Sequence, residues 1–326
     1  MSPLQPKSRG TLLMVTAVFV LSPDALLISL VGSDPWVLIF WRGLLTASTL
    51  TVAMICARGG RAFGEAMKLG AAGIVTGLFF GMSTISFVLS VRMTSAANTL
   101  VIIAAMPLFS AILTRVFTGE KVPGRTWAAV AAGFAGIAVV FSGSVTKGNP
   151  AGDLLALLTA LLMASNFVII RRNSHLNMIP AVILSGVLTS LVTAFISDPL
   201  SPGTGDILML VVMGSVVLPI PLALMTVAPK LIPAAEVGLI MLLETFLGPF
   251  WVWLALGEKP PGETLLGGGI LIATLALHAV AGLRKTDMGV SEYGGVGEKQ
   301  TQGRGDTEEN RCRNAVTRRR TDTKTQ

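Results

Sequence analysis

Long apolar runs, one after another, constrain this chain more than any other feature. An α-helix needs about 20 mainly apolar residues to cross the hydrocarbon of a bilayer. The runs are about twice the length of a barrel strand and lack its strict alternation, so helices are expected. They lie at residues 11–31, 36–57, 69–91, 95–117, 125–143, 151–171, 178–197, 206–229, 233–256 and 263–283. The sequence therefore predicts an all-α integral membrane protein with ten transmembrane helices.

Composition excludes several other classes of protein. With 52% hydrophobic and 13% charged residues, the chain is too apolar for a soluble domain of 326 residues. Its formal charge of +7 resides in short loops and in the C-terminal segment, so no nucleic-acid partner is expected. Cys56 and Cys312 cannot form a disulfide framework, and His175 and His278 lack the spacing of metal ligands. We therefore expect neither a disulfide framework nor a metal site.

The two ends of the chain are expected to differ from the apolar body. Lys7 and Arg9 precede the first apolar run as in a secretory signal, but no small-residue cleavage site follows and Asp24 interrupts the run. Residues 1–10 should then be a cytoplasmic N-terminus ahead of a retained first helix. Residues 284–326 hold almost no large apolar side chain, so they are expected to form a disordered cytoplasmic tail.

The distribution of Lys and Arg predicts the direction of insertion, because cytoplasmic loops hold these residues in excess. With the N-terminus inside, the outer loops hold only Arg92, Lys147 and Lys259. The inner segments then hold Lys7, Arg9, Arg58, Arg61, Lys68, Arg115, Lys121, Arg125, Arg171, Arg172, Lys230, Arg284 and Lys285. Both ends are therefore expected inside the cell, with the helices crossing the cell (plasma) membrane.

An internal repeat divides the apolar body into two halves, residues 11–143 and 150–283. Three short motifs recur 138 positions later (257 minus 119) without a gap. They are Ala96-Ala97 and Ala234-Ala235, Gly119-Glu120-Lys121 and Gly257-Glu258-Lys259, and Pro123-Gly124 and Pro261-Gly262. Each half has five predicted helices, and an odd number places the second half upside down relative to the first. Inverted repeats of this kind are typical of secondary transporters, whose equivalent halves exchange conformations about a central site.

The arrangement of these motifs resembles the drug/metabolite transporter superfamily, specifically the EamA type. The resemblance covers about residues 11–283 and includes Leu21-Ser22-Pro23-Asp24 and Phe40-Trp41-Arg42-Gly43 in the first two helices. It implies two inverted five-helix repeats and a secondary carrier, typically an exporter of amino acids, amines or other metabolites, without a bound cofactor. Pro180 stands 138 positions beyond Arg42, so this part of the repeat has diverged. The long polar tail is also unlike the family's usual short ending.

Asp24 and Arg42 are charged residues inside predicted helices 1 and 2, where a central charge costs about 2.5–3.5 kcal/mol on insertion scales. Counted from the outer helix ends, both lie at a depth of about 10 Å, so we expect them to pair. The pair could be a neutral strut that fixes the first two helices. Alternatively, Arg42 could offer its planar donors to a substrate carboxylate, with Asp24 tuning or releasing it.

Glu244 lies about twelve residues from either end of predicted helix 9, near the bilayer midplane. No basic residue is close to it in this helix, and its counterpart 138 positions earlier is the neutral Met106. Burial disfavours the charged form of a lone carboxylate, so Glu244 could carry a proton or bind a substrate ammonium group. The alternative is a protonated glutamate that is hydrogen-bonded within the bundle.

Two asparagines and several prolines complete the candidate site. Asn98, the counterpart of Glu236, lies near a helix start, where a capping or first-turn role is expected. Asn166 in predicted helix 6 is placed on a central path together with helices 1, 4, 8 and 9. Prolines bend these four helices and free backbone carbonyls, which are tolerated only against protein or a wet cavity. The prolines are Pro23, Pro107, Pro219, Pro221 and Pro249.

These features favour a secondary transporter that takes a small-molecule substrate across a lipid bilayer, with a homodimer left open. A polytopic membrane enzyme acting on a lipid carrier would need a clustered nucleophile, base or metal site at the membrane surface, and the sequence suggests none. A membrane sensor without transport would not explain a midplane glutamate. ATP-driven transport is not expected, because no glycine-rich Gly-Lys-Ser/Thr phosphate loop is present.

Overall fold

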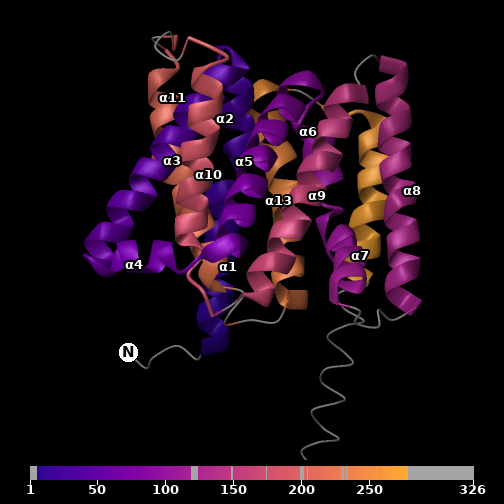
Figure 1. The fold of residues 1–326 in the computed structure, drawn as a ribbon. Helices are drawn as coiled ribbons and strands as arrows, with labels where there is room; N and C mark the ends of the chain where they lie inside the picture. Colours follow the sequence, from indigo (N-terminus) through magenta and orange to yellow (C-terminus); the bar gives the residue numbers. More distant parts are fainter. Residues whose placement is uncertain are drawn as a thin grey trace, which may run out of the picture. The chain divides into compact units, whose positions relative to one another are not determined.

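The structure, a computed structural model, consists mainly of helices (Figure 1). It describes residues 6–118, 124–147, 150–173, 175–198, 202–203, 205–228, 231, 234–257 and 259–277. No strand occurs among these residues. The labelled helices are α1 (Pro6–Leu21), α2 (Asp24–Leu30), α3 (Pro35–Arg58), α4 (Arg61–Met67), α5 (Gly70–Met93), α6 (Ala96–Ile103), α7 (Met106–Thr118), α8 (Gly124–Lys147), α9 (Pro150–Arg172), α10 (Ile179–Ala194), α11 (Ile207–Val212), the π-helical turn η1 (Met213–Val217), α12 (Pro219–Val227) and α13 (Ala234–Leu256). A further helix, Gly262–Leu277, follows.

Within the described parts of the chain, seven segments are long and apolar enough to cross a bilayer. They are Ser8–Leu30, Pro35–Arg58, Gly70–Met93, Ala96–Phe117, Thr126–Gly143, Pro150–Ile170 and Ile207–Val227. Three shorter apolar helices are Ile179–Ala194, Leu243–Leu256 and Gly262–Leu277. Each segment falls on one of the apolar runs in the sequence. The prediction of an all-helical fold is confirmed for the part of the chain that the structure describes.

Three of the membrane-spanning segments are interrupted where prolines stand, as predicted. The first breaks between α1 and α2 at Pro23, and the fourth between α6 and α7, just before Pro107. The segment Ile207–Val227 passes through η1 before Pro219 and Pro221. Proline has no N–H to donate and its ring clashes with the preceding turn, so a regular helix cannot pass through it undisturbed. By contrast, α13 continues through Pro249.

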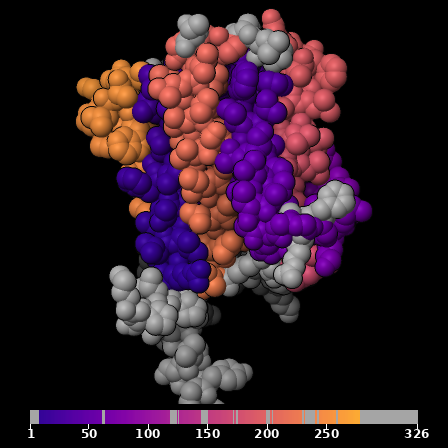
Figure 2. All heavy atoms as spheres, turned by 90° about the vertical axis from the view of Figure 1, so that its left-hand side faces the viewer, coloured from indigo at the N-terminus to yellow at the C-terminus, as the bar shows by residue number. Residues whose placement is uncertain are grey.

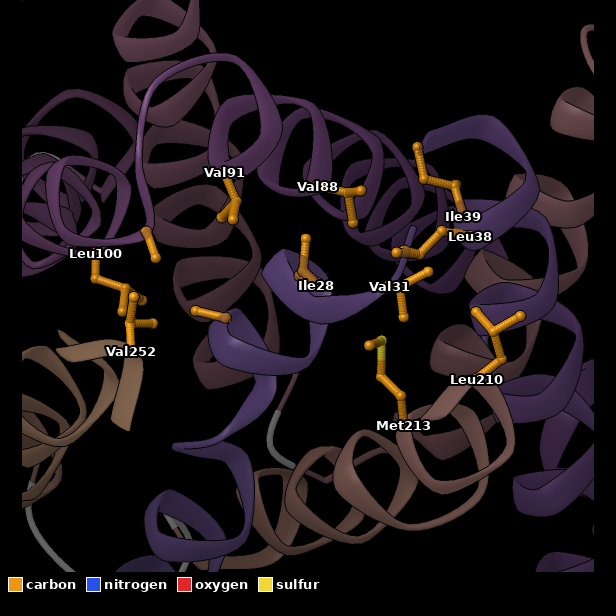
Figure 3. Packing of buried hydrophobic residues seen from close by; sticks show 12 residues of the cluster. Ile28, Val31, Leu38, Ile39, Val88, Val91, Leu100, Leu210, Met213 and Val252 are labelled. Atoms are coloured by element: carbon orange, nitrogen blue, oxygen red, sulfur yellow. The ribbon is translucent and has the colours of Figure 1, made fainter. Parts of the chain in front are cut away.

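Apolar side chains packed around α2 form one of the cores (Figure 3). Ile28 and Val31, both fully buried, point toward side chains from several other helices. These neighbours are Leu38 and Ile39 of α3, Val88 and Val91 of α5, Leu100 of α6, Leu210 of α11, Met213 of η1 and Val252 of α13. The core therefore joins helices from before residue 143 to helices from after residue 150.

Glycines allow two pairs of helices to cross closely. A Cβ on Gly43 of α3 would lie 2.8 Å from the carbonyl oxygen of Gly186 in α10. A Cβ on Gly136 of α8 would lie 2.7 Å from the carbonyl oxygen of Gly267 in the last described helix. Such distances leave no room for a side chain, so small residues at these crossings bring the backbones together, as in other membrane bundles.

Large apolar side chains cover the outside of the bundle. On the face shown in Figure 2, α1, the α11–α12 segment and α3 lie side by side. Phe19 of α1 is 60% exposed, Val52 of α3 is 61% exposed and Leu208 of α11 is 73% exposed. Exposure of so many large apolar side chains is unfavourable in water but suits lipid tails. The molecule is therefore a multi-pass membrane protein.

Several features predicted from the sequence lie outside the described residues. These are the tail 284–326, the first Gly119-Glu120-Lys121 motif and Glu258 of the second. The side chain of Glu236 also lies outside the described part of the chain.

Candidate functional site

Asp24 and Arg42 form a buried, two-pronged ion pair, as their matched depths predicted. Asp24 begins α2 just after the break at Pro23, and Arg42 lies two turns into α3. Arg42 Nη1 donates to Asp24 Oδ1 and Nη2 donates to Oδ2, each at 2.6 Å. Asp24 is 4% exposed and Arg42 is 3% exposed. A bidentate pair of this geometry is among the strongest charge-assisted contacts in proteins.

The remaining surroundings of the Arg42 guanidinium come from two other helices. Its Nη1 also donates to the Met213 sulfur in η1, at 3.2 Å, and its Cζ lies 5.7 Å from the centre of the Phe87 ring in α5. Its Nε is buried and has no hydrogen-bond partner among the described residues. Asp24 therefore occupies the end-on face that the two Nη atoms form, and a second ligand could reach only the edge that includes the buried Nε.

A small pocket opens where α6 gives way to α7, facing α13. Its lining is almost entirely apolar, apart from Glu244 and Thr245 of α13. The other lining residues are Leu100, Ile103, Ala104, Met106, Pro107 and Met241. The break between α6 and α7 shapes this pocket, because the chain turns away from the helical path at Ala104 and Ala105. Contacts of α13 with α1, α2 and α6 enclose the surrounding region.

Glu244 is the only charged residue among the described residues that line this pocket. It is half-buried, and it has no hydrogen-bond or ion-pair partner among the residues that the structure describes. Asp24, another carboxylate, lies within electrostatic range of it. A carboxylate in these surroundings is poorly stabilised when charged, so a proton or a bound cation would stabilise it.

Residues at equivalent positions of the sequence repeat meet in this pocket. Met106 and Glu244 differ by 138 positions (244 minus 106), and both line the pocket. The same offset relates Ile103 to Met241 and Pro107 to Thr245, which also line it. The predicted site residues Met106 and Glu244 are thus brought together, and the pocket takes the same positions from each half.

Asn98 and Asn166 are buried but do not line the pocket. The Asn98 Nδ2 donates to Thr94 Oγ1 at 3.2 Å, and its Oδ1 accepts from the Thr264 hydroxyl. With its amide oriented to match donors with acceptors, Asn166 donates to Thr76 O at 3.3 Å and accepts from Phe80 N at 3.1 Å. Asn98 thus links α6 to the last described helix, and Asn166 links α9 to α5.

Asp153, which the sequence reasoning missed, is fully buried in the first turn of α9. Neither of its carboxylate oxygens has a hydrogen-bond partner among the described residues. An acidic residue just inside an apolar run was the available signal, but the helix dipole by itself accounts for an acid in a first turn. The position of α9 against neighbouring helices, rather than the local sequence, buries this side chain.

Two polar clasps tie segments together at opposite ends of α3, a helix about 36 Å long at 1.5 Å per residue. At one end, Asp206 accepts from Ser33 Oγ at 2.5 Å, from Ser33 N at 2.7 Å and from Gly32 N at 3.2 Å. The Ser33 hydroxyl is the main cause that lowers the pKa of Asp206. Arg92 of α5 holds the same loop by donating to Val31 O at 2.8 Å.

At the other end of α3, Glu65 of α4 is the centre of the second clasp. Its Oε2 accepts from Asn177 Nδ2 at 2.7 Å, and its Oε1 pairs with Arg58 at 2.5 Å. The Asn177 amide is the largest cause of a lowered pKa at Glu65, and Arg58 adds to it. Among the described residues, no group of three or more His, Cys, Asp or Glu side chains could hold a metal ion.

Comparison with known proteins identifies the family. The model of the EamA-like transporter family matches twice, over residues 8–142 and 150–280. A solved crystal structure is 19% identical, with a TM-score of 0.62 over 85% of this chain and 99% of its own, and so shares the fold. No curated protein matches. Because the family model covers most of the sequence in two repeats, this membrane protein belongs to the EamA-like transporter family.

Proposed function

We propose that the protein is a secondary transporter that moves a small metabolite, such as an amino acid or an amine, across the cell membrane by alternating access. Glu244 is the observation that carries this proposal: a carboxylate without a partner among the described residues faces a pocket at a helix break. Ionisable groups inside a membrane bundle are costly and usually mark a transport path. Interrupted helices are tolerated inside the hydrocarbon region of a membrane where the interruption lines a cavity.

The two halves are proposed to be inverted, with ten spans and both ends in the cytoplasm. Three contacts between counterparts support this arrangement: α3 with α10, α6 with α13, and α8 with the last described helix through Gly136 and Gly267. Counterparts that pack against one another are expected around the axis that relates inverted repeats. Cysteines placed at Gly119 and Gly257 should be labelled from opposite sides of the membrane. Labelling from one side would overturn the inverted arrangement.

We further propose that an existing ion gradient drives the transport. Glu244 would couple the movement of the ion to the movement of the substrate. Metabolite profiles of cells and medium, compared with and without the gene, test transport itself. The profile should shift for at least one small metabolite in wild-type cells, and Glu244→Gln should abolish that shift at equal membrane abundance. Glu263→Gln is the matched control, because Glu263 stands in the first turn of the last described helix and does not line the pocket.

Each result of this comparison has a separate meaning. No difference between cells with and without the gene, across metabolites and directions of gradient, would contradict the transporter proposal. If Glu244→Gln transports at the wild-type rate with unchanged dependence on the gradient, the protein is still a transporter but the coupling site lies elsewhere. Asp24 is then the next candidate.

A further inference from the structure

We propose that the pocket beside Glu244 binds a monovalent organic cation with an apolar body, namely a protonated amine rather than a carboxylate-bearing solute. This inference rests on the proposed transport function and specifies its substrate class. It is carried by the contrast between two charged groups of the bundle: the Arg42 guanidinium is occupied by Asp24, whereas Glu244 has no partner among the described residues.

The pocket holds a suitable partner for the charged ammonium group of such a ligand and another for its apolar body. The Glu244 carboxylate would accept hydrogen bonds from an ammonium group, and charge-assisted bonds of this kind are roughly twice as strong as neutral ones. Leu100, Ile103, Met106 and Met241 would contact the apolar body of the ligand once the pocket, which is small in this structure, widens around it. Methionine adapts to ligands of different shape because its side chain is unbranched and polarisable.

An anionic ligand would meet unfavourable charges at the same place. Glu244 would repel it, and the nearby Asp24–Arg42 pair offers no compensating charge because its two members neutralise each other. None of the described residues that line the pocket is basic. Of the neighbouring cations, Arg42 is held by two bonds of 2.6 Å to Asp24, and releasing it would strand a buried carboxylate. The pocket therefore selects positive charge.

Binding of three molecules of similar size tests this selection: phenethylamine, 3-phenylpropionate and 2-phenylethanol. The purified protein in detergent should bind radiolabelled phenethylamine saturably, and bind the alcohol and the carboxylate at least ten-fold more weakly. Glu244→Gln should weaken amine binding at least ten-fold, while Glu244→Asp should retain part of it. Monodisperse elution of each variant shows that it is folded. Glu263→Gln should bind the amine as the wild type does.

Two results would overturn the proposal: binding of 3-phenylpropionate in preference to the amine, or equal amine binding by wild type and Glu244→Gln. The assay requires no transport, so its failure is distinct from failure of the proposed function. A shifted metabolite profile without amine binding would keep the transporter and reject the amine. Amine binding without any shifted profile would keep the amine site and reject the proposed transport.

A second inference comes from the two end clasps, whose contacts do not involve residues of the pocket. The Asp206 clasp joins the α2–α3 loop to the segment that precedes α11, while the Glu65 clasp joins the segment after α9 to α4. In terms of the repeat, each clasp ties the first loop of one half to the second loop of the other half. Glu65 and Asp206 stand at nearly equivalent positions of the repeat. The counterpart of Glu65, 138 residues later, is Gly203, which lies three residues before Asp206. The geometry points to equivalent locks, one at each end of the bundle.

The two locks would open in turn as the pocket faces one side of the membrane and then the other. Two cysteine pairs test this in a Cys56→Ser, Cys312→Ser background: Ser33→Cys with Asp206→Cys, and Glu65→Cys with Asn177→Cys. Cross-linking either pair with a short, reducible dithiol reagent should abolish transport, and a reductant should restore it. Phenethylamine binding in detergent should survive either single cross-link, because one end stays free to open.

Loss of binding only when both pairs are cross-linked would support alternate locks. Transport that continues with either pair fully cross-linked would overturn the inference. A pair of cysteines at Ser48 and Val52, on one exposed face of α3, controls for the reagent and should leave transport unchanged on cross-linking.

Discussion

Asp24 and Glu244 are carboxylates in the same bundle with opposite surroundings. Asp24 is almost fully buried and accepts two hydrogen bonds from one guanidinium, while Glu244 is half-buried, faces an apolar pocket and has no partner among the described residues. A buried charge with a good partner belongs to the structure, because removing the partner is more harmful than keeping the pair. A buried charge without a partner lowers the stability of the protein, so it is retained for another reason. For Glu244, the apolar pocket that it faces supports ligand binding as that reason.

The largest effect is expected when the satisfied pair is broken. Asp24→Asn should lower the free energy of unfolding by about 3–5 kcal/mol, because it strands the buried Arg42 cation. The double variant Asp24→Asn with Arg42→Gln should be less destabilised than the sum of the two single variants predicts. The measurement is the fraction of folded protein in detergent against denaturant concentration. Additive effects of the two changes would argue that the pair contributes no mutual stabilisation.

The opposite sign is expected at Glu244. Glu244→Met gives this position the residue that its counterpart Met106 already has, and should stabilise the protein by about 1–3 kcal/mol because it removes an unpaired polar group from an apolar pocket. Transport and amine binding should be lost in the same variant. The same unfolding measurement, made beside a binding assay, checks both parts. A destabilised Glu244→Met would mean that the carboxylate has a structural partner after all.

A smaller effect is expected at the Asp206 clasp, whose carboxylate is satisfied but lies outside the membrane-spanning segments. Ser33→Ala should cost about 1 kcal/mol, the usual contribution of a hydrogen bond. Because the clasp lowers the pKa of Asp206 from 3.8, its stabilisation is present above pH 3.8 and is lost as the pH falls below that value. Stability of wild type and Ser33→Ala, compared across pH 3–7, should converge at the acidic end. A constant difference would assign the effect to packing.

The smallest effect is expected at Glu65, where Arg58 is 51% exposed and water screens the pair. Glu65→Gln should change the free energy of unfolding by less than about 1 kcal/mol, as for most surface ion pairs. Thermal unfolding in detergent at low and high salt is the appropriate measurement. If Glu65→Gln destabilised the protein as much as Asp24→Asn does, solvent exposure would not explain a difference in stability between the two sites.

Sequence patterns predicted much of this molecule because bilayer physics acts on short segments. A chain cannot leave backbone groups unpaired in hydrocarbon, so apolar runs of sufficient length become helices wherever they stand. The matched depths of Asp24 and Arg42 predicted their pairing, since adjacent antiparallel helices place equal depths side by side. Pro23, Pro107, Pro219 and Pro221 predicted the breaks for the local reason that proline cannot donate a backbone hydrogen bond. The offset of 138 residues indicated two repeats, which the family model also matches.

Only the tertiary structure decided which polar groups meet across distant segments. Asn166 bonds to the backbone of α5 instead of facing the pocket, and Asp153 is buried because neighbouring helices cover it. Asp206 reaches Ser33 across 173 residues, a contact that no local pattern encodes. Helix formation depends on residues a few positions apart, whereas the rotation of each helix about its axis depends on all of its neighbours together. The sequence by itself therefore determined the helices and their depths, and packing determined which side chains face one another.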